Sequence, residues 1–123
     1  MRVLVVEDEL LIRWSIAQTL ADAAHMVIEA EDAAGAMAAV KDATAPVDAV
    51  LLDYRLPDSD DLSLLANIRR FSPRSAVILM TAHGTPDLIK GAIDLGAYTV
   101  MNKPFDMQDL IHVLVKASGS CTD

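Results

Sequence analysis

Short apolar segments alternate with longer amphipathic segments along the whole chain, and this alternation constrains the fold more than any other feature. Apolar runs of this length, separated by longer helical patterns, are typical of strands buried on both faces. We predict five strands, at Val3–Val6, Met26–Ala30, Ala49–Leu52, Ala76–Met80 and Tyr98–Met101. Strands that alternate with helices form a parallel sheet covered on both faces. The chain is therefore expected to adopt an α/β fold with a doubly wound, five-stranded parallel sheet.

The segments between the strands carry the end signals of helices. Thr85 is a suitable N-cap, the proline that follows it suits the first helical position, and Gly96 falls where that helix should end. Asp106 is the expected N-cap of the last helix. The alanine-rich segment Ala33–Ala43 also favours a helix, because alanine has the highest helix propensity.

Length and charge narrow the class of protein. The chain has 123 residues, enough for one core, and we assign residues 1–118 to a single domain and residues 119–123 to a flexible tail. A net charge of −8 opposes direct nucleic-acid binding by this domain, since phosphate backbones require a basic surface. The single cysteine, Cys121, lies in the tail without a neighbouring base, so we interpret it as incidental.

Neither a membrane anchor nor a secretory signal is expected. No uninterrupted apolar run approaches the roughly 18 residues that a membrane-spanning helix needs. The apolar run at the start of the chain is stopped at once by Glu7, so it is too short for a signal peptide. We therefore expect a cytoplasmic protein that does not bind membranes.

Polar residues follow four of the five predicted strands. Glu7–Glu9 follow the first strand, Asp53 the third, Thr81 the fourth and Lys103 the fifth. Taken singly, these residues could be an exposed acidic turn, a loop cap, a turn-capping hydroxyl and a surface lysine. In open α/β sheets, however, ligands bind at the carboxyl ends of the strands. Together the four sites supply metal ligands, a nucleophile, a hydroxyl donor and a cation, which are the parts needed for Mg²⁺-assisted phosphoryl transfer.

The sequence around these residues resembles the receiver domains of two-component response regulators. The resemblance runs from Met1 to about Ala117 and includes VLVVEDE at the start, LLDYRLP around Asp53, MTAHG after the fourth strand and LGAYTVMNKPFD near the end. It implies a flavodoxin-like (βα)5 fold with strand order 2-1-3-4-5. The last two motifs are most similar to receivers attached to enhancer-binding transcriptional regulators.

The resemblance implies a metal site and a phosphoacceptor. Asp53 would accept the phosphoryl group and also bind Mg²⁺ (or Mn²⁺) through a carboxylate oxygen. Asp8 would bind the ion directly, the backbone carbonyl of Arg55 would add a further ligand, and Glu7 would support the ion through water.

The phosphoryl oxygens would be held by a second set of residues. The resemblance assigns this role to the Thr81 hydroxyl, the backbone N–H of Ala82 and the Lys103 ammonium. Arg55 and His83, two positions after Asp53 and Thr81, correspond to the variable pair that tunes dephosphorylation in this family.

Partners and output also follow from the resemblance. The phosphoryl donor would be a phosphohistidine on a sensor histidine kinase or a phosphotransfer protein. The domain would catalyse only its own phosphorylation and slow autodephosphorylation, so it would not be an enzyme with turnover. Phosphorylation would change the surface formed by the fourth helix, fifth strand and fifth helix. That surface would reach a downstream effector domain or protein, and it could also serve a homodimer.

Three positions call for separate expectations. Val100 stands where many family members have Tyr or Phe, and Tyr98 lies about 7 Å upstream by strand rise, so a simple aromatic replacement is not expected. Asp61 stands where glycine is common, and slight backbone strain is expected if this residue has positive φ. The family also implies a cis peptide bond between Lys103 and Pro104.

Three other functions are compared with this hypothesis. A degenerate receiver would act only as a protein-binding module, but such domains typically lose the acids, the acceptor or the lysine, and all are present here. An aspartate-nucleophile phosphatase of the haloacid dehalogenase type usually has a second acid where this chain has Arg55. A flavin-binding flavodoxin would need a Ser/Thr/Gly-rich phosphate loop after Val6, which this sequence lacks.

Overall fold

The computed structural model of the chain describes residues 1–42, 44 and 46–119, with side chains described up to residue 117. Over these residues five strands alternate with five helices: β1 (Arg2–Val6), α1 (Leu10–Asp22), β2 (Met26–Ala30), α2 (Ala33–Lys41), β3 (Ala49–Asp53), α3 (Ser63–Phe71), β4 (Ala76–Thr81), α4 (Pro86–Asp94), β5 (Thr99–Asn102) and α5 (Met107–Gly119). All strand pairs are parallel, and the sheet order is β2-β1-β3-β4-β5. The predicted fold class and strand order are confirmed.

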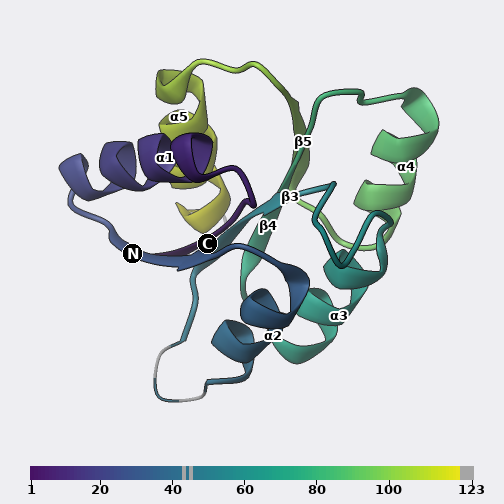
Figure 1. Cartoon of the computed structure of the whole chain (residues 1–123), viewed down its shortest axis with the longest axis horizontal. Helices are drawn as coiled ribbons and strands as arrows, with labels where there is room; N and C mark the ends of the chain where they lie inside the picture. The colour runs from purple at the N-terminus through teal and green to yellow at the C-terminus, as the bar shows by residue number, and fades with distance from the viewer. Residues whose placement is uncertain (43, 45, 120–123) are drawn as a thin grey trace.

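Helices cover both faces of the sheet and create two hydrophobic cores. Helices α1 and α5 lie together on one face, and α2, α3 and α4 lie on the other (Figure 1). Successive side chains of a strand point to opposite faces, so β3 contributes Val50 and Leu52 to one core and Ala49 and Leu51 to the other. All five residues of β3 and all six of β4 are buried, which explains their nearly continuous apolar sequence.

Strands β3, β4 and β5 extend one residue further toward their carboxyl ends than predicted, whereas β1 and β2 end as predicted. Asp53 and Thr81 are the last residues of β3 and β4, although we predicted that the strands end one residue earlier. Strand β5 is shifted by one residue from the prediction and ends at Asn102. Strand pairing depends on backbone N–H and C=O groups, so a polar side chain does not end it: Asp53 is in register with Met80, and Thr81 with Asn102. Asp53 and Thr81 therefore stand on the sheet itself.

The predicted helix ends are confirmed at three positions. The Thr85 side chain accepts a hydrogen bond from Leu88 N at 3.2 Å, as an N-cap should. Gly96 has φ +102° just after α4, a conformation that favours glycine. The Asp106 carboxylate accepts a hydrogen bond from Gln108 N at 2.8 Å directly before α5.

Two backbone expectations have different outcomes. The peptide bond between Lys103 and Pro104 is cis, as predicted. The expected strain at Asp61 is wrong, because Ala24 is the non-glycine residue with positive φ in the described part of the chain. Asp61 instead closes a local turn, in which its carboxylate accepts hydrogen bonds from Ser63 N at 2.9 Å and from Ser63 Oγ at 2.5 Å.

Some expectations fall on residues at the limits of the description. Helix α2 ends at Lys41, and Ala43 lies outside the described residues. Of the predicted tail, Gly119 is the last residue of α5, and residues 120–123, which include Cys121, lie outside the described residues. Among the described helices, none is both long enough and apolar enough to cross a membrane.

Leu51 should contribute strongly to the stability of the strand that carries Asp53. Its side chain is fully buried, so Leu51→Ala is expected to lower the free energy of unfolding by about 2–5 kcal/mol. Leu11→Ala is the matched control: Leu11 is 77% exposed on α1, and its change is expected to stay within about 0.5 kcal/mol. Urea denaturation measures both values. Equal losses in the two variants would contradict the central position of β3 in the core.

Candidate functional site

The carboxyl ends of β1, β3, β4 and β5 meet around one cavity. Its volume is about 440 Å³, and it is lined by Asp8, Glu9, Asp53, Tyr54, Arg55, Thr81, Ala82, His83 and Lys103. Glu7 joins this group through an ion pair with Lys103. The residues singled out after four separate strands in the sequence are thus brought together in one place.

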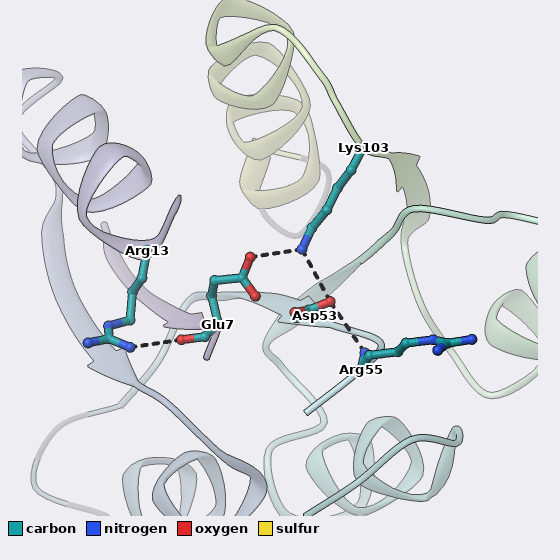
Figure 2. Close-up of polar contacts among 5 residues, drawn as sticks. All are labelled: Glu7, Arg13, Asp53, Arg55 and Lys103. Carbon is teal, nitrogen blue, oxygen red and sulfur yellow. Dashed lines mark hydrogen bonds and ion pairs between the residues drawn. The ribbon is translucent and has the colours of Figure 1, made fainter. Parts of the chain in front are cut away.

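Lys103 connects two of the acidic residues. Its Nζ atom lies 2.8 Å from Glu7 Oε1 and 3.3 Å from Asp53 Oδ1 (Figure 2). The residue follows β5 directly, and its backbone N–H donates to Thr81 O at 2.7 Å, which fixes the start of the side chain beside β4. Burial lowers the pKa of the Lys103 ammonium, but the hydrogen bonds and charges of Glu7 and Asp53 outweigh burial, and the net shift is upward. Lys103 is therefore a fixed positive charge at neutral pH.

Three carboxylates crowd the other side of the site. Glu7, Asp8 and Asp53 each place one oxygen within 4.8 Å of the others. Glu7 and Asp53 are buried, whereas Asp8 is exposed. Burial raises the pKa of Glu7 to about 8, and the neighbouring Asp53 carboxylate adds to this rise, while Lys103 opposes it. One cation is therefore too little to balance the charge of the group.

These carboxylates fit a hard divalent cation. Glu7 Oε2 is buried and has no hydrogen-bond partner among the described residues, and a buried polar atom of this kind is costly unless something else satisfies it. Carboxylate oxygens are the ligands that Mg²⁺ prefers, and Mg²⁺ usually keeps several waters. The exposed Asp8 leaves one side of the group open to a hydrated ion. The donor set therefore suits Mg²⁺, and Glu7, Asp8 and Asp53 are the residues that could hold it.

Asp53 is held by the backbone that follows it. The N–H of Arg55 donates to Asp53 Oδ1 at 3.3 Å, and the N–H of Tyr54 donates to Met80 O at 2.9 Å, which continues the pairing of β3 with β4. Asp53 is 7% exposed and lines the cavity from the end of the buried strand β3, so its position is well fixed. The side chain of Arg55 points away from Asp53 (Figure 2), which leaves its backbone as the part nearest the carboxylate.

Thr81 presents a hydroxyl group at the end of β4. It is 5% exposed, and its Oγ accepts a hydrogen bond from His83 N at 3.2 Å. A threonine hydroxyl that accepts from a backbone N–H keeps its own hydrogen for another acceptor. Ala82 and His83 are exposed and line the cavity next to Thr81. The β4–α4 loop can therefore supply hydrogen-bond donors to an anion beside Asp53.

Two side chains at the site were missed in the sequence because they bind backbone atoms. Arg13 in α1 donates from Nη1 to Glu7 O at 2.9 Å, and Asn102 at the end of β5 accepts from Gly84 N at 2.9 Å. Neither belongs to a motif of acids or hydroxyls after a strand. The sequence contains one signal for Arg13: it is a charged residue that directly follows the apolar Ile12 in an amphipathic helix. Such residues are common in helices, so this signal alone does not indicate a role.

Comparisons with family models and with curated proteins indicate the same family. The family model described as response regulator receiver domain matches residues 3–115. The DNA-binding transcriptional regulator NtrC of Escherichia coli K12 is 35% identical over 113 residues, which are 92% of this chain and 24% of that protein. This chain thus spans about a quarter of the length of its NtrC relatives.

Solved structures agree with this assignment. The receiver domain of NtrX from Brucella abortus is 38% identical, with a TM-score of 0.86, and the match covers 96% of this chain and 98% of that one. A CheY-like receiver domain protein from Methanospirillum hungatei has a TM-score of 0.93 over 98% of this chain and 95% of its own; at 23% identity it shows the same fold. The chain therefore belongs to the response regulator receiver domain family.

Proposed function

We propose that this receiver domain is a phosphorylation switch of a two-component phosphorelay and that it accepts a phosphoryl group on Asp53. One observation carries the proposal: the buried Asp53 carboxylate lies 3.3 Å from the Lys103 ammonium and belongs to a group of three carboxylates suited to Mg²⁺. With Mg²⁺ bound as well, a nucleophile next to two positive charges would be able to receive a group that carries several negative oxygens. Membership of the receiver family supports the signalling role.

The chemistry assigned to this chain is a single displacement. A carboxylate oxygen of Asp53 attacks phosphorus in line, the bond from phosphorus to the donor nitrogen breaks, and an acyl phosphate forms. Lys103, freed from part of its pairing with Asp53, binds the phosphoryl oxygens, and the Thr81 hydroxyl and the Ala82 N–H donate to them. Bound Mg²⁺ would neutralise charge on the phosphoryl oxygens and on the acids around them.

Water removes the phosphoryl group from Asp53. Hydrolysis of the acyl phosphate needs access to phosphorus, and Arg55 and His83 line the cavity next to Asp53 and Thr81. We infer that these two side chains set the rate of autodephosphorylation by controlling that access. The domain then catalyses its own phosphorylation and slow dephosphorylation, without turnover of another substrate.

The partners are inferred from the chemistry and from the relatives. The phosphoryl donor is proposed to be a phosphohistidine of a sensor histidine kinase or of a phosphotransfer protein. Because this chain matches about a quarter of DNA-binding transcriptional regulators, the output is proposed to be an effector domain or protein. The surface formed by α4, β5 and α5 is a candidate for this contact and for homodimerisation. Exposed apolar side chains support that choice, namely Ile93, Leu95, Tyr98 and Val115.

Two other functions make different demands on the same site. A degenerate receiver would need no phosphoacceptor chemistry, yet the acids, the hydroxyl and the lysine lie around one cavity. A phosphatase with an aspartate nucleophile would use a second acid two residues after Asp53. Here that position is Arg55, whose side chain points away from the carboxylate (Figure 2).

Incubation with acetyl phosphate and Mg²⁺ tests the phosphoacceptor. Wild-type protein is expected to gain one phosphoryl group by intact mass measurement, and Asp53→Asn is expected to gain none, because an amide is not a nucleophile here. Asp60→Asn is the matched control, since Asp60 is an exposed acid of the same β3–α3 connection, and it should be labelled like the wild type. An adduct that survives in Asp53→Asn would refute the assignment. Steady release of phosphate would favour the phosphatase, and no adduct in wild type would favour the degenerate receiver.

The raised pKa of Glu7 gives a pH dependence that Mg²⁺ should remove. The carboxyl has an ordinary pKa of 4.5 and a pKa of about 8 in the folded protein, so the folded state holds the proton more tightly. Its contribution to stability is complete below pH 4.5 and is lost as the pH rises through 8. In EDTA, the free energy of unfolding should therefore fall between about pH 5 and 8, by no more than about 1.4 kcal/mol per pH unit from this group.

Urea denaturation at a series of pH values measures this slope. Glu7→Gln cannot ionise, so it should lose this part of the slope, whereas Glu9→Gln, at an exposed neighbouring position, should retain it. Added Mg²⁺ should stabilise the wild type most at the alkaline end, where the carboxylate is free to meet the ion. The same slope in wild type and Glu7→Gln would show that Glu7 is not the titrating group.

A further inference from the structure

Arg13 lies beside the candidate site and contacts the backbone of Glu7 and the side chain of Glu29. The residue lies in α1, and its side chain extends across the end of β1 toward β2 (Figure 2). Its Nη1 donates to the backbone oxygen of Glu7 at 2.9 Å, and its Nε lies 3.1 Å from Glu29 Oε1 in β2. The Arg13 side chain is only 13% exposed, and its bond to the Glu7 carbonyl is partly buried, whereas the Glu29 side chain is 47% exposed. Arg13 therefore links α1 with β2 and with the residue that follows β1, next to the acidic group.

The carbonyl that Arg13 binds belongs to the peptide unit between Glu7 and Asp8. A peptide unit is planar, so the direction of its C=O also sets the direction of the next N–H and of the two Cα atoms it joins. Strand β1 ends at Val6, and Glu7 N still donates to Ala30 O at 3.0 Å. Pairing with β2 thus fixes the peptide before Glu7, and Arg13 fixes the peptide after it.

This peptide unit decides where two acidic side chains point. Glu7 is buried against Lys103, whereas Asp8, the next residue, is exposed at the cavity, yet their carboxylates lie within 4.8 Å of each other and of Asp53. Without Arg13, the partly buried Glu7 carbonyl would lack its donor and would turn toward water. Rotation of the peptide would move the Asp8 carboxylate away from Asp53.

We propose that Arg13 is a positioning residue for the cation site, which holds the Glu7–Asp8 peptide so that both carboxylates face Asp53. The inference rests on the proposed function, because it takes the acidic group to be a Mg²⁺ site. Glu29 acts with Arg13: its carboxylate fixes the guanidinium, whose planar array of donors can bind a carboxylate and a carbonyl at once.

Electrostatics and positioning predict opposite results when Arg13 is removed. A positive charge near a cation site repels the ion, so loss of the charge alone would strengthen Mg²⁺ binding. Loss of the positioning bond would weaken it, because the ligands would have to be reordered at binding. The direction of the change in Mg²⁺ affinity therefore separates the two explanations.

The test measures Mg²⁺ binding by isothermal titration calorimetry. Arg13→Met keeps much of the apolar stem and loses every donor, and its Kd for Mg²⁺ is expected to rise about tenfold, as for other residues that orient metal ligands. Arg13→Lys keeps a donor for the Glu7 carbonyl but cannot also bind Glu29 in the same way, so its Kd is expected to rise less than that of Arg13→Met. Arg70→Met is the matched control: it removes an exposed arginine at the end of α3, and its Kd should stay at the wild-type value.

Two further readouts separate positioning from a general loss of structure. Amide hydrogen exchange at Asp8 and Glu9 should speed up in Arg13→Met, while exchange in β3 and β4 stays slow. Phosphorylation by acetyl phosphate should be slower than wild type at low Mg²⁺ and should recover at saturating Mg²⁺. Unchanged or tighter Mg²⁺ binding in Arg13→Met would overturn the inference. Wild-type protein that binds no Mg²⁺ would overturn the proposed metal site, and the inference with it.

Discussion

Repulsion among three carboxylates is the constraint around which the site is arranged. A parallel sheet brings the carboxyl ends of its strands to one edge, and here β1 and β3 bring Glu7, Asp8 and Asp53 within 4.8 Å of one another. Burial makes the charge of Glu7 more costly, which raises the pKa of its carboxyl group. Lys103 offsets part of this cost from β5. The remaining imbalance is what makes the site receptive to a further cation.

The sheet can support this imbalance because its centre is rigid. Strands β3 and β4 are buried along their whole length, with a hydrophobic core on each face. Asp53 and Thr81 are themselves strand residues, so backbone pairing holds them in place independently of their side chains. The two stable cores thus fix the positions of the Asp53 carboxylate and the Thr81 hydroxyl, which we propose as nucleophile and hydrogen-bond donor, so that less reorganisation is needed when a phosphoryl group binds.

The sequence revealed the parts of this arrangement that depend on side-chain pattern. Apolar runs located the five strands, and the polar residues after them located the site, because parallel strands end at a common edge. It did not reveal interactions that end on backbone atoms. Strand pairing through Asp53 and Thr81, the bond from Arg13 to the Glu7 carbonyl and the bond from Gly84 to Asn102 leave no periodic signal. The expectation at Asp61 failed for a related reason, since a side-chain turn replaced positive φ.

One of these backbone contacts also connects the site with the start of α4. Val100 packs into the core on the α4 side, and Tyr98 is exposed before β5 begins, so neither provides an aromatic ring beside Thr81. The short loop from Thr81 to the N-cap Thr85 is instead held by a hydrogen bond from Gly84 N, directly before the N-cap, to the Asn102 side chain. Asn102 directly precedes Lys103, so the residue that holds this loop is also the neighbour of the lysine in the chain. We propose that a change in the pairing of Lys103 or in the position of the Thr81 hydroxyl is passed to the start of α4 through this loop.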